Sequence, residues 1–375
     1  MKTEDFERVR ERLNGVSRRD FMKFCTVMAA SMGLPLSSAE KLAAAVTAPA
    51  RPPVIWLSGQ ACTGCTESLL RPSHPSLEHL ILDLISLDYN ETLNTGAGHQ
   101  AEAALRASME KNAGKFILVI EGAIPVKDGG VYCMVGGKPF AETVRETAAK
   151  AAAVIAIGSC ASWGGVAAAA PNPTGATGAP EFLKGTSVVT IPGCPPNAYN
   201  FLSTVVHFLT FGKLPALDDK GRPKFAYGRL IHENCERRPH FDAGRFATKF
   251  GDDGHRQGFC LYKLGCKGPV TYANCPAVLF NDVGPGAWPV GTGHPCFGCT
   301  EQGVGFHIPI HTQADLKHLT PAAAYPSITC ERTETGASLG AVALVAGAAG
   351  VAVGAAAAVA KNLGSCEQDD TKKGE

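Results

Sequence analysis

Cysteine is the residue type whose number and spacing most clearly suggest chemistry, with 14 copies in a chain of 375 residues. In the stretch WLSGQACTGCTESLL, Cys62 and Cys65 lie three positions apart, directly after a short apolar run. Such a pair occurs in redox dithiols, zinc sites, disulfides and the ligand sets of iron–sulfur clusters. A chain of this length needs no disulfides to fold, so the excess of cysteine indicates metal binding.

Two further cysteines each follow an apolar run of their own. Cys160 comes after AVIAIGS, and Cys194 comes after SVVTIPG. If these runs are parallel strands, their carboxyl ends meet at one edge of a sheet, where four thiolates could hold a metal ion or a 4Fe-4S cluster. A dithiol leaves Cys160 and Cys194 unexplained. Zinc is usually held by two close pairs, so the spacing favours a cluster and leaves zinc as the alternative.

A second group of candidate ligands lies further along the chain. His232 and Cys235 form a His-x-x-Cys pair, and Cys260 and Cys266 follow it. This set could hold a cluster with one histidine ligand, although a lone histidine is ordinarily a surface or core residue without a metal. A set of three thiols comes next, one short of the four that a cubane needs: Cys275, Cys296 and Cys299.

The elements that must position these ligands are predicted from short apolar runs that alternate with helical patterns. The predicted strands cover residues 53–58, 80–88, 116–122, 153–159 and 187–193. Segments with helical spacing, such as GHQAEAALRASMEKNAG and AYNFLSTVVHFLTFG, lie between or after them. This rhythm is typical of an α/β fold with a doubly wound parallel sheet, and five strands match the flavodoxin-like count. We therefore expect a flavodoxin-like domain over residues 51–221.

Residues 222–330 are rich in Gly, Pro, His and Cys and have little regular periodicity. This composition predicts a smaller, irregular domain that is organised by what it binds. Charge excludes one class of partner, because 35 basic and 34 acidic residues leave no electrostatic footprint for nucleic acid.

The N-terminal region, residues 1–50, resembles a twin-arginine export signal. Arg18 and Arg19 lie in SRRDFMK, ahead of the mildly apolar segment FCTVMAASMGLPL, and several candidate cleavage points precede Arg51. The alternative is an ordinary basic helix start, since Arg-Arg pairs occur on many solvated helix faces. A twin-arginine route normally carries folded proteins, often with a cofactor already bound, so an export signal of this kind agrees with metal sites.

The C-terminal region predicts a membrane anchor. Residues 336–360 carry no charge over 25 positions, and a helix of that length, at about 1.5 Å per residue, spans the roughly 30 Å hydrocarbon core of a bilayer. The alternative is a flexible Ala/Gly tail or an Ala-rich soluble helix, because Leu, Ile and Phe are scarce. With the globular part exported, the tail at 361–375 and its lysines would lie on the cytoplasmic side, in agreement with the positive-inside rule.

Taken together and in order, these motifs resemble the small subunit of a membrane-bound nickel–iron hydrogenase, of the hydrogenase-2 type. The resemblance covers the export signal, both domains and the C-terminal anchor. The motifs that carry it are WLSGQACTGCTESLL, AIGSCASWGG, IPGCPPN, GRLIHENCERRPHFDAGRFA, LGCKGPVTYANCP and GHPCFGC.

The resemblance implies three clusters with defined ligands. The proximal 4Fe-4S cluster, which faces the large subunit, would be held by Cys62, Cys65, Cys160 and Cys194. The distal 4Fe-4S cluster near the surface would be held by His232, Cys235, Cys260 and Cys266. The medial 3Fe-4S cluster would be held by Cys275, Cys296 and Cys299, with Pro289 at the position where three-iron members of the family also carry a proline.

Four cysteines fall outside these sets. Cys25 lies in the signal region and Cys366 lies beyond the anchor, so neither is expected to reach the clusters. Cys133 and Cys330 are expected to be plain buried thiols, the commonest state of a free cysteine. Gly64 and Gly165 occupy the two positions where oxygen-tolerant members of the family carry extra cysteines, so we expect oxygen to inactivate the enzyme.

The implied function is electron relay in an uptake hydrogenase. The large subunit of this family carries the nickel–iron centre and oxidises hydrogen to two protons and two electrons, and this chain lacks the paired CxxC sites for such a centre. The resemblance further implies a membrane electron-transfer partner that feeds the quinone pool, a dimer of heterodimers, and a location on the periplasmic side of the cytoplasmic membrane.

Two rival hypotheses are kept beside this one. The first is another exported iron–sulfur electron-transfer subunit, related to the cluster-bearing subunit of respiratory complex I that resembles the first domain. The His232 set, the set of three thiols and the export signal argue against it. The second is an exported protein without redox function, whose cysteines form disulfides. A brown protein with a broad absorption band would exclude this second rival.

Overall fold

The computed structural model describes residues 22–23, 25–26, 29–30, 32–46, 51–72, 85–280 and 288–316. The chain divides into two compact units, Met1–His318 and Leu319–Glu375, and all of the described residues lie in the first. The predicted membrane segment 336–360, the tail 361–375, Cys330, Cys366 and the arginine pair Arg18–Arg19 lie outside the described residues. Within the described ranges, no helix has the length and apolar character needed to cross a membrane.

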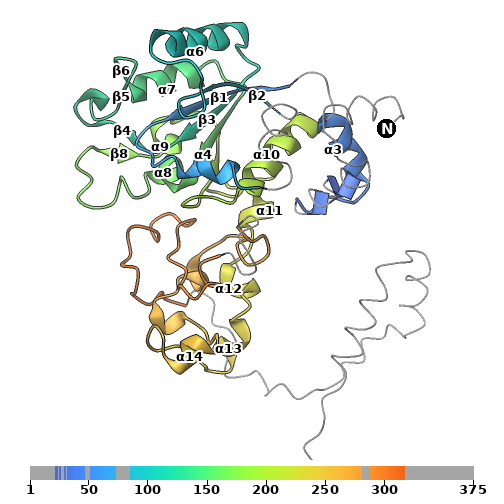
Figure 1. Cartoon of the computed structure of the whole chain (residues 1–375), viewed down its shortest axis with the longest axis vertical. Coiled ribbons are helices and arrows are strands. Elements are labelled where there is room, and N and C mark those ends of the chain that lie inside the picture. Colours follow the sequence, from blue (N-terminus) through green and yellow to red (C-terminus); the bar gives the residue numbers. More distant parts are fainter. Residues whose placement is uncertain are drawn as a thin grey trace, which may run out of the picture. The chain divides into compact units, whose positions relative to one another are not determined.

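A five-stranded parallel sheet forms the first part of this unit (Figure 1). Its strand order, β2-β1-β3-β7-β9, is the flavodoxin-like order in which the chain crosses over once and then continues outward. The prediction of a doubly wound α/β sheet is therefore confirmed. The strands are β1 (Pro53–Ser58), β2 (Ser86–Asn90), β3 (Ile117–Glu121), β7 (Ala153–Ile157) and β9 (Val188–Ile191). The predicted strand over 80–88 differs in its bounds, since the observed strand begins at Ser86, and residues 80–84 are not described.

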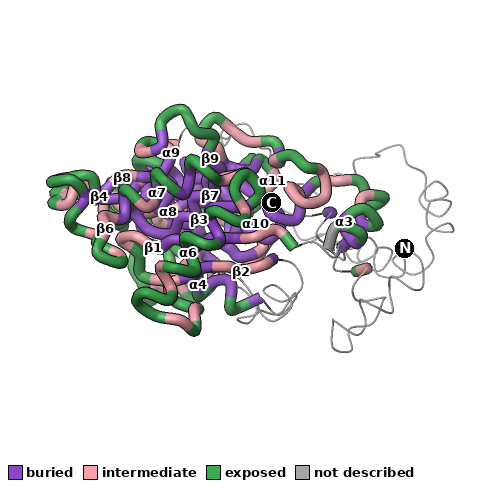
Figure 2. Tube along the Cα trace, turned by 90° about the horizontal axis from the view of Figure 1, so that it is seen from above, coloured by how far each residue is buried: buried purple, intermediate pink, exposed green. Residues whose placement is uncertain are grey.

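Alternation along the strands builds two hydrophobic cores, one on each face of the sheet. Successive residues of β1 show this, because Val54 and Trp56 belong to one core while Ile55 and Leu57 belong to the other. The first core packs against α10 (Ala198–Phe211), and the second against α6 (His99–Lys111) and α7 (Phe140–Ala148). Figure 2 shows the central strands as buried between these helices. Burial on both faces explains why the strands read as continuous Val/Ile runs.

Helix α10 has clear local signals at both ends. The side chain of Asn197 accepts a hydrogen bond from the Tyr199 backbone N–H at 3.0 Å and caps the first turn. Gly212, with φ of 64°, ends the helix in the left-handed conformation. Two small antiparallel sheets lie outside the five-stranded sheet. One pairs β4 (Ile124–Pro125) with β8 (Ala176–Thr177), and the other pairs β5 (Met134–Val135) with β6 (Lys138–Pro139). Short helices follow β1, β4, β7 and β8: α4 (Gly64–Leu69), η2 (Lys127–Gly130), α8 (Gly158–Trp163) and α9 (Ala179–Phe182).

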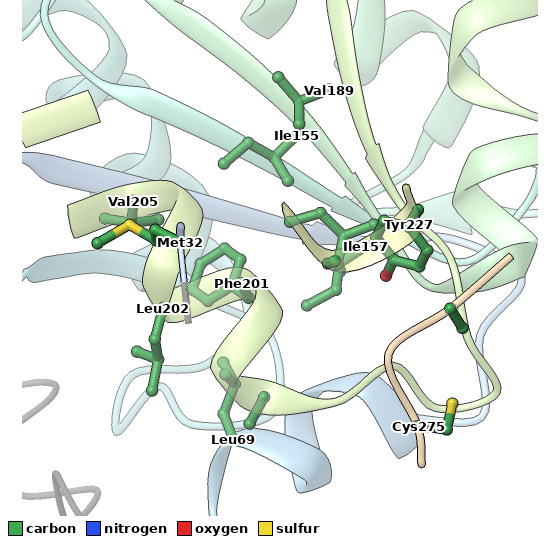
Figure 3. Packing of buried hydrophobic residues seen from close by; sticks show 14 of the residues in the cluster. Met32, Leu69, Ile155, Ile157, Val189, Phe201, Leu202, Val205, Tyr227 and Cys275 are labelled. Atoms are coloured by element: carbon green, nitrogen blue, oxygen red, sulfur yellow. The ribbon is translucent and has the colours of Figure 1, made fainter. Parts of the chain in front are cut away.

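The described part of the predicted signal region packs on the folded body. Helix α3 (Ser38–Val46) contacts α10, and Leu42 is fully buried. Met32 lies beside Val205 and Leu202 of α10 (Figure 3), and Cys25 belongs to the same core. The described residues of this N-terminal segment therefore cover an apolar face of α10.

Residues after the sheet form short helices joined by long loops, as the weak periodicity indicates (Figure 1). These elements are α11 (Lys224–Tyr227), α12 (Ile231–Asn234), α13 (Arg238–Asp242), α14 (Asp253–Arg256), η3 (Tyr262–Leu264) and η4 (Gly268–Val270). A buried ion-pair network joins this region to the sheet domain. The Arg222 guanidinium donates to Asp218 at 2.7 Å and to Glu301 at 2.9 Å, and Lys220 also pairs with Glu301.

Candidate iron–sulfur sites

The four thiols of the predicted proximal set are brought together at the carboxyl edge of the sheet. Cys62 and Cys65 follow β1 and lie in or just before α4, Cys160 lies in α8 directly after β7, and Cys194 follows β9. Cys65 interacts electrostatically with the other three thiols. Cys62 and Cys194 are exposed, while Cys65 and Cys160 are half-buried. The set therefore lies at the surface of this chain.

Two glycines leave the space that these thiols occupy. A Cβ on Gly158, where φ is +83°, would lie 2.5 Å from the Cys65 sulfur. A Cβ on Gly165, where φ is +51°, would lie 2.6 Å from the Cys160 sulfur. Real Cβ atoms do not approach sulfur so closely, and both backbone conformations are ones that glycine adopts most readily. The loops are thus built around the sulfur atoms.

Glu121, at the end of β3, is a buried carboxylate that fixes the CxxC loop. It accepts hydrogen bonds from the backbone N–H groups of Cys65 at 3.0 Å and Thr66 at 3.2 Å, and from the Thr66 hydroxyl. The indole N–H of Trp56 donates to it at 2.8 Å. The side chain is 1% exposed. A carboxylate at the first turn of α4 satisfies donors that the helix leaves unpaired.

We expect Glu121→Leu to lower the free energy of unfolding by about 3 kcal/mol, because buried donors that lose their acceptor cost about 1–3 kcal/mol each. The measurement is thermal unfolding followed by circular dichroism, together with iron content. Glu67→Leu is the matched control, since Glu67 is an exposed carboxylate in α4, the helix whose first turn Glu121 contacts. Equal melting temperatures for the two variants would contradict this role of Glu121.

The predicted medial set is more deeply placed. Cys275 and Cys296 are buried, at 9% and 7% exposure, and Cys299 is half-buried. Cys299 interacts electrostatically with Cys275, and Cys296 interacts with Cys299. The structure therefore brings together the three thiols that the sequence pattern groups.

Ser159 ties the proximal and medial sets to each other. Its hydroxyl donates to the carbonyl of Cys299 and accepts from the backbone N–H of Gly193 at 3.0 Å, and it is 1% exposed. Because Ser159 precedes Cys160 and Gly193 precedes Cys194, one hydroxyl links three ligand-bearing segments.

The three thiols of the predicted distal set also lie close to one another. Cys235 interacts electrostatically with Cys266 and Cys260. The Cys235 sulfur accepts a hydrogen bond from the Arg237 N–H at 3.4 Å. Gly268 lies between Cys266 and His232. A Cβ on Gly268 would be 3.5 Å from the Cys266 sulfur and 3.7 Å from the His232 backbone nitrogen.

His232 has the features of a metal ligand. Its Nε2 atom is buried and has no hydrogen-bond partner, which is rare for a polar atom in a native interior. The ring packs edge-on against Phe241 with centroids 4.5 Å apart. Burial, together with nearby Arg238, lowers the pKa of His232 to about 4, so the ring is neutral and can offer a lone pair.

The described thiols are free, and burial raises the pKa of several of them. None of the cysteines in the described ranges forms a disulfide. Burial raises the pKa of Cys194 and Cys260 to about 11 and that of Cys235 and Cys275 to about 12. No three of the described His, Cys, Asp and Glu side chains converge as ligands of a single metal ion would. The glycine cradles, the grouped thiols and the unpartnered His232 nitrogen fit iron–sulfur clusters as the bound groups.

Sequence reasoning missed two residues of these sites. Glu121 ends an apolar strand, and its charge in the run FILVIEG is the only local sign that it faces a site. Ser159 precedes a ligand, but serine is common in turns and carries no specific signal. Cys133 is half-buried, less than expected, and lies outside all three sets.

Two known families match this chain, one over the sheet domain and one over the irregular region that follows it. The family described as "NADH ubiquinone oxidoreductase, 20 Kd subunit" matches residues 62–208, which covers most of the sheet domain. The family of C-terminal regions of NiFe/NiFeSe hydrogenase small subunits matches residues 227–310, which contain the medial and distal sets. Together with the similarities that follow, this second match shows that the chain belongs to the small subunits of nickel–iron hydrogenases.

The similarity extends over nearly the whole chain. The chain is 54% identical to the hydrogenase-2 small chain of Escherichia coli K12 over 357 residues, which cover 95% of each chain. It is also 54% identical to the periplasmic [NiFe] hydrogenase small subunit of Solidesulfovibrio fructosivorans, over 77% of this chain and 90% of that one. The crystal structure of a reduced, active form of the Ni-Fe-Se hydrogenase from Desulfomicrobium baculatum matches 71% of this chain and 100% of that chain, with a TM-score of 0.66 and 35% identity.

Proposed function

We propose that this small subunit relays electrons in an uptake hydrogenase that oxidises hydrogen to two protons and two electrons at the nickel–iron centre of its large subunit. The proposed proximal 4Fe-4S ligands are Cys62, Cys65, Cys160 and Cys194. The proposed medial 3Fe-4S ligands are Cys275, Cys296 and Cys299. The proposed distal 4Fe-4S ligands are His232, Cys235, Cys260 and Cys266. Membership of the family supports the relay role, and the grouping of these side chains supports the assignment.

The observation that carries the proposal is a pair of hydrogen bonds that connect the three sets in series. The Ser159 hydroxyl, next to the proximal residue Cys160, donates to the carbonyl of the medial residue Cys299. The backbone N–H of Lys267, next to the distal residue Cys266, donates to the carbonyl of the medial residue Cys296 at 2.7 Å. The segments that carry neighbouring sets are thereby held together, which supports a relay from one set to the next.

The protein contributes ligation, hydrogen bonds and burial. Iron–sulfur clusters bound here would supply one-electron redox chemistry, whose potentials depend on hydrogen bonds to sulfur and on solvent exposure. Backbone N–H groups of Val166 and Ala167 donate to the Cys160 sulfur. Burial raises the pKa of the Cys296 thiol, and the backbone N–H of Gly298 opposes that rise. A neutral histidine in place of one thiolate makes the distal set less negative, which favours its reduced state.

The exposed proximal set supports a large subunit that covers it. The residues around η2 that are apolar and exposed run from the end of β4 to the start of β5: Val126, Val131, Tyr132 and Met134. The bridge between Gln60 and Ala123 holds this region against the CxxC loop. Exposed apolar side chains gathered at one place mark a protein interface. We infer that the large subunit docks on this surface.

This proposal is tested by identifying the protein that copurifies with the chain and the type of the medial cluster. A large nickel-containing protein should copurify with the chain, and electron paramagnetic resonance (EPR) of the oxidised complex should show a 3Fe-4S signal that disappears on mild reduction. Pro289→Cys should convert the medial cluster to 4Fe-4S and lower its potential, because a fourth thiolate retains the fourth iron and adds negative charge. Pro289 lines one groove with Cys194 and Cys299, which places it beside the medial set. Three cubane clusters in the native protein would refute the medial assignment.

We further propose export by the twin-arginine route and anchoring by residues 336–360 on the periplasmic side of the cytoplasmic membrane, where a membrane partner passes electrons to the quinone pool. Replacing Arg18 and Arg19 together with Lys should retain the folded protein in the cytoplasm. The measurement is the distribution of hydrogenase activity between periplasmic and cytoplasmic fractions. Lys2→Arg is the control, since it alters a basic residue outside the pair. Normal export of the double variant would contradict this route.

A relative of the complex I subunit is the weaker alternative. The corresponding family matches the sheet domain, but the residues of the medial and distal sets are matched by the hydrogenase family. A preparation without nickel in any partner would favour this alternative.

A further inference from the structure

Lys267 is a buried lysine between the proposed medial and distal sites. It follows the distal residue Cys266 directly in sequence, and it is 0% exposed. Its backbone N–H donates to the carbonyl of the medial residue Cys296 at 2.7 Å. Its carbonyl accepts from the hydroxyl of Thr271 at 2.6 Å. The residue therefore contacts both ligand-bearing segments.

The side chain of Lys267 ends in a shell of acceptors. Its Nζ lies 2.7 Å from the carbonyl oxygen of Ile310, 2.9 Å from that of Pro309, and 3.1 Å from those of Gly265 and Thr312. Carbonyl oxygens cannot donate, so every proton in these bonds must come from the lysine. An ammonium group has three protons to offer, and the shell is thus suited to the charged form.

This charge has no carboxylate partner among the residues that the structure describes. A fully buried charge is ordinarily paired with an opposite charge, because carbonyl dipoles replace its hydration but do not neutralise it. Burial lowers the pKa of Lys267, and the groups whose charges oppose this shift are the thiols of Cys296 and Cys266. These thiols become negative when they bind iron, so the missing counter-charge is supplied by the loaded sites.

We propose that Lys267 is a buried counter-ion shared by the medial and distal clusters, and that its charge raises the reduction potentials of both. The inference rests on the proposed cluster assignment. A positive charge in a medium of low dielectric constant stabilises the more negative, reduced state of a neighbouring cluster. Lys267 acts through the ligands, so it is a positioning and tuning residue. Because it neighbours one ligand of each set, it raises both potentials together and changes the difference between them little.

The test is a redox titration of the purified complex, with each cluster followed by EPR. Lys267→Gln should shift the medial and distal midpoint potentials to lower values together and move the proximal potential less. Lys267→Arg, which keeps the charge, should leave both near the native values. Lys263→Gln is the matched control, because Lys263 is an exposed cation four residues before Lys267, in η3. A loaded Lys267→Gln protein with native potentials and only a lower melting temperature would show that the lysine is merely a structural tether.

If Lys267→Gln does not retain its clusters, a second pair of variants tests whether the charge of Lys267 raises the medial and distal potentials. Thr312 is exposed, and its carbonyl binds the ammonium, so Thr312→Asp adds a negative charge beside Lys267 without removing it. Thr312→Asn has the same shape and no charge. Lower medial and distal potentials in the Asp variant at low salt support the proposal, and equal potentials overturn it. Absence of a 3Fe-4S signal in the native complex would instead refute the cluster assignment, so the two failures are distinguishable.

Discussion

Replacing Cys299 with alanine is expected to abolish hydrogen oxidation coupled to an electron acceptor while leaving the large subunit able to activate hydrogen. Cys299 is one of three proposed medial ligands, and its carbonyl accepts from the Ser159 hydroxyl at the junction with the proximal set. Without it, the medial site keeps two thiols and cannot hold three irons. Electrons would then have to pass from the proximal to the distal site without an intermediate.

The measurement separates relay from catalysis. Exchange of deuterium gas with water protons needs no electron relay and should continue, whereas reduction of a dye by hydrogen should fall to background. EPR should show loss of the medial signal with the proximal and distal clusters still reducible. Cys133→Ala is the control, since Cys133 is a half-buried thiol outside the three sets. Dye reduction at the native rate by Cys299→Ala would refute the series arrangement.

Introducing cysteine at Gly165 is expected to disrupt the proximal site rather than to confer oxygen tolerance. A Cβ at this position would lie 2.6 Å from the Cys160 sulfur and 2.8 Å from the Cys160 backbone nitrogen and Cα. These are backbone contacts that no rotamer can relieve, and the φ of +51° adds strain for any residue with a side chain. The loop that carries Cys160 must move before a thiol fits.

Gly64 provides the matched comparison. A Cβ there meets only the Cys62 sulfur, at 3.1 Å, so Gly64→Cys should load its clusters normally. We expect the Gly165→Cys variant to lose iron from the proximal site and to melt at a lower temperature. The double variant should show the same losses as Gly165→Cys. Iron content, proximal EPR and hydrogen oxidation under air are the measurements. The native enzyme should be inactivated by oxygen. Sustained turnover in air by the native enzyme would contradict that expectation, and the same result for the double variant would show that the proximal loops can accept the extra thiols.

The sheet could be predicted closely because its strands are buried on both faces. Runs such as PVIWLS and AVIAIGS are short, apolar and bounded by turn residues, and β1 has the predicted bounds of Pro53–Ser58. The small pairs β4–β8 and β5–β6 were not predicted, since two-residue strands leave no periodic signal. The packing of α3 on α10 was not predicted either, because an export signal is recognised without reference to what it contacts.

The candidate ligands could be named from sequence because cysteine spacing and family motifs are local. Their environment could not, since the side chains that support the ligands come from distant segments. Glu121 meets the CxxC loop only after β1 and β3 pair, and Ser159 meets Cys299 only when the irregular domain folds against the sheet. Lys267 reads in sequence as an ordinary solvated cation. Its burial depends on carbonyls more than 40 residues away, at Pro309 and Ile310.

The proximal set takes its ligands from the loops after β1, β7 and β9, so it spans the sheet from the first strand of the domain to its last. A cluster held by these loops is a covalent cross-link between segments that lie far apart in the chain. Closing a loop on the order of 100 residues removes about 4.7 kcal/mol of chain entropy from the unfolded state. The same group that carries electrons would therefore act as a staple, and oxidative loss of its iron would free the loops of the sheet edge and weaken the fold as well as the relay.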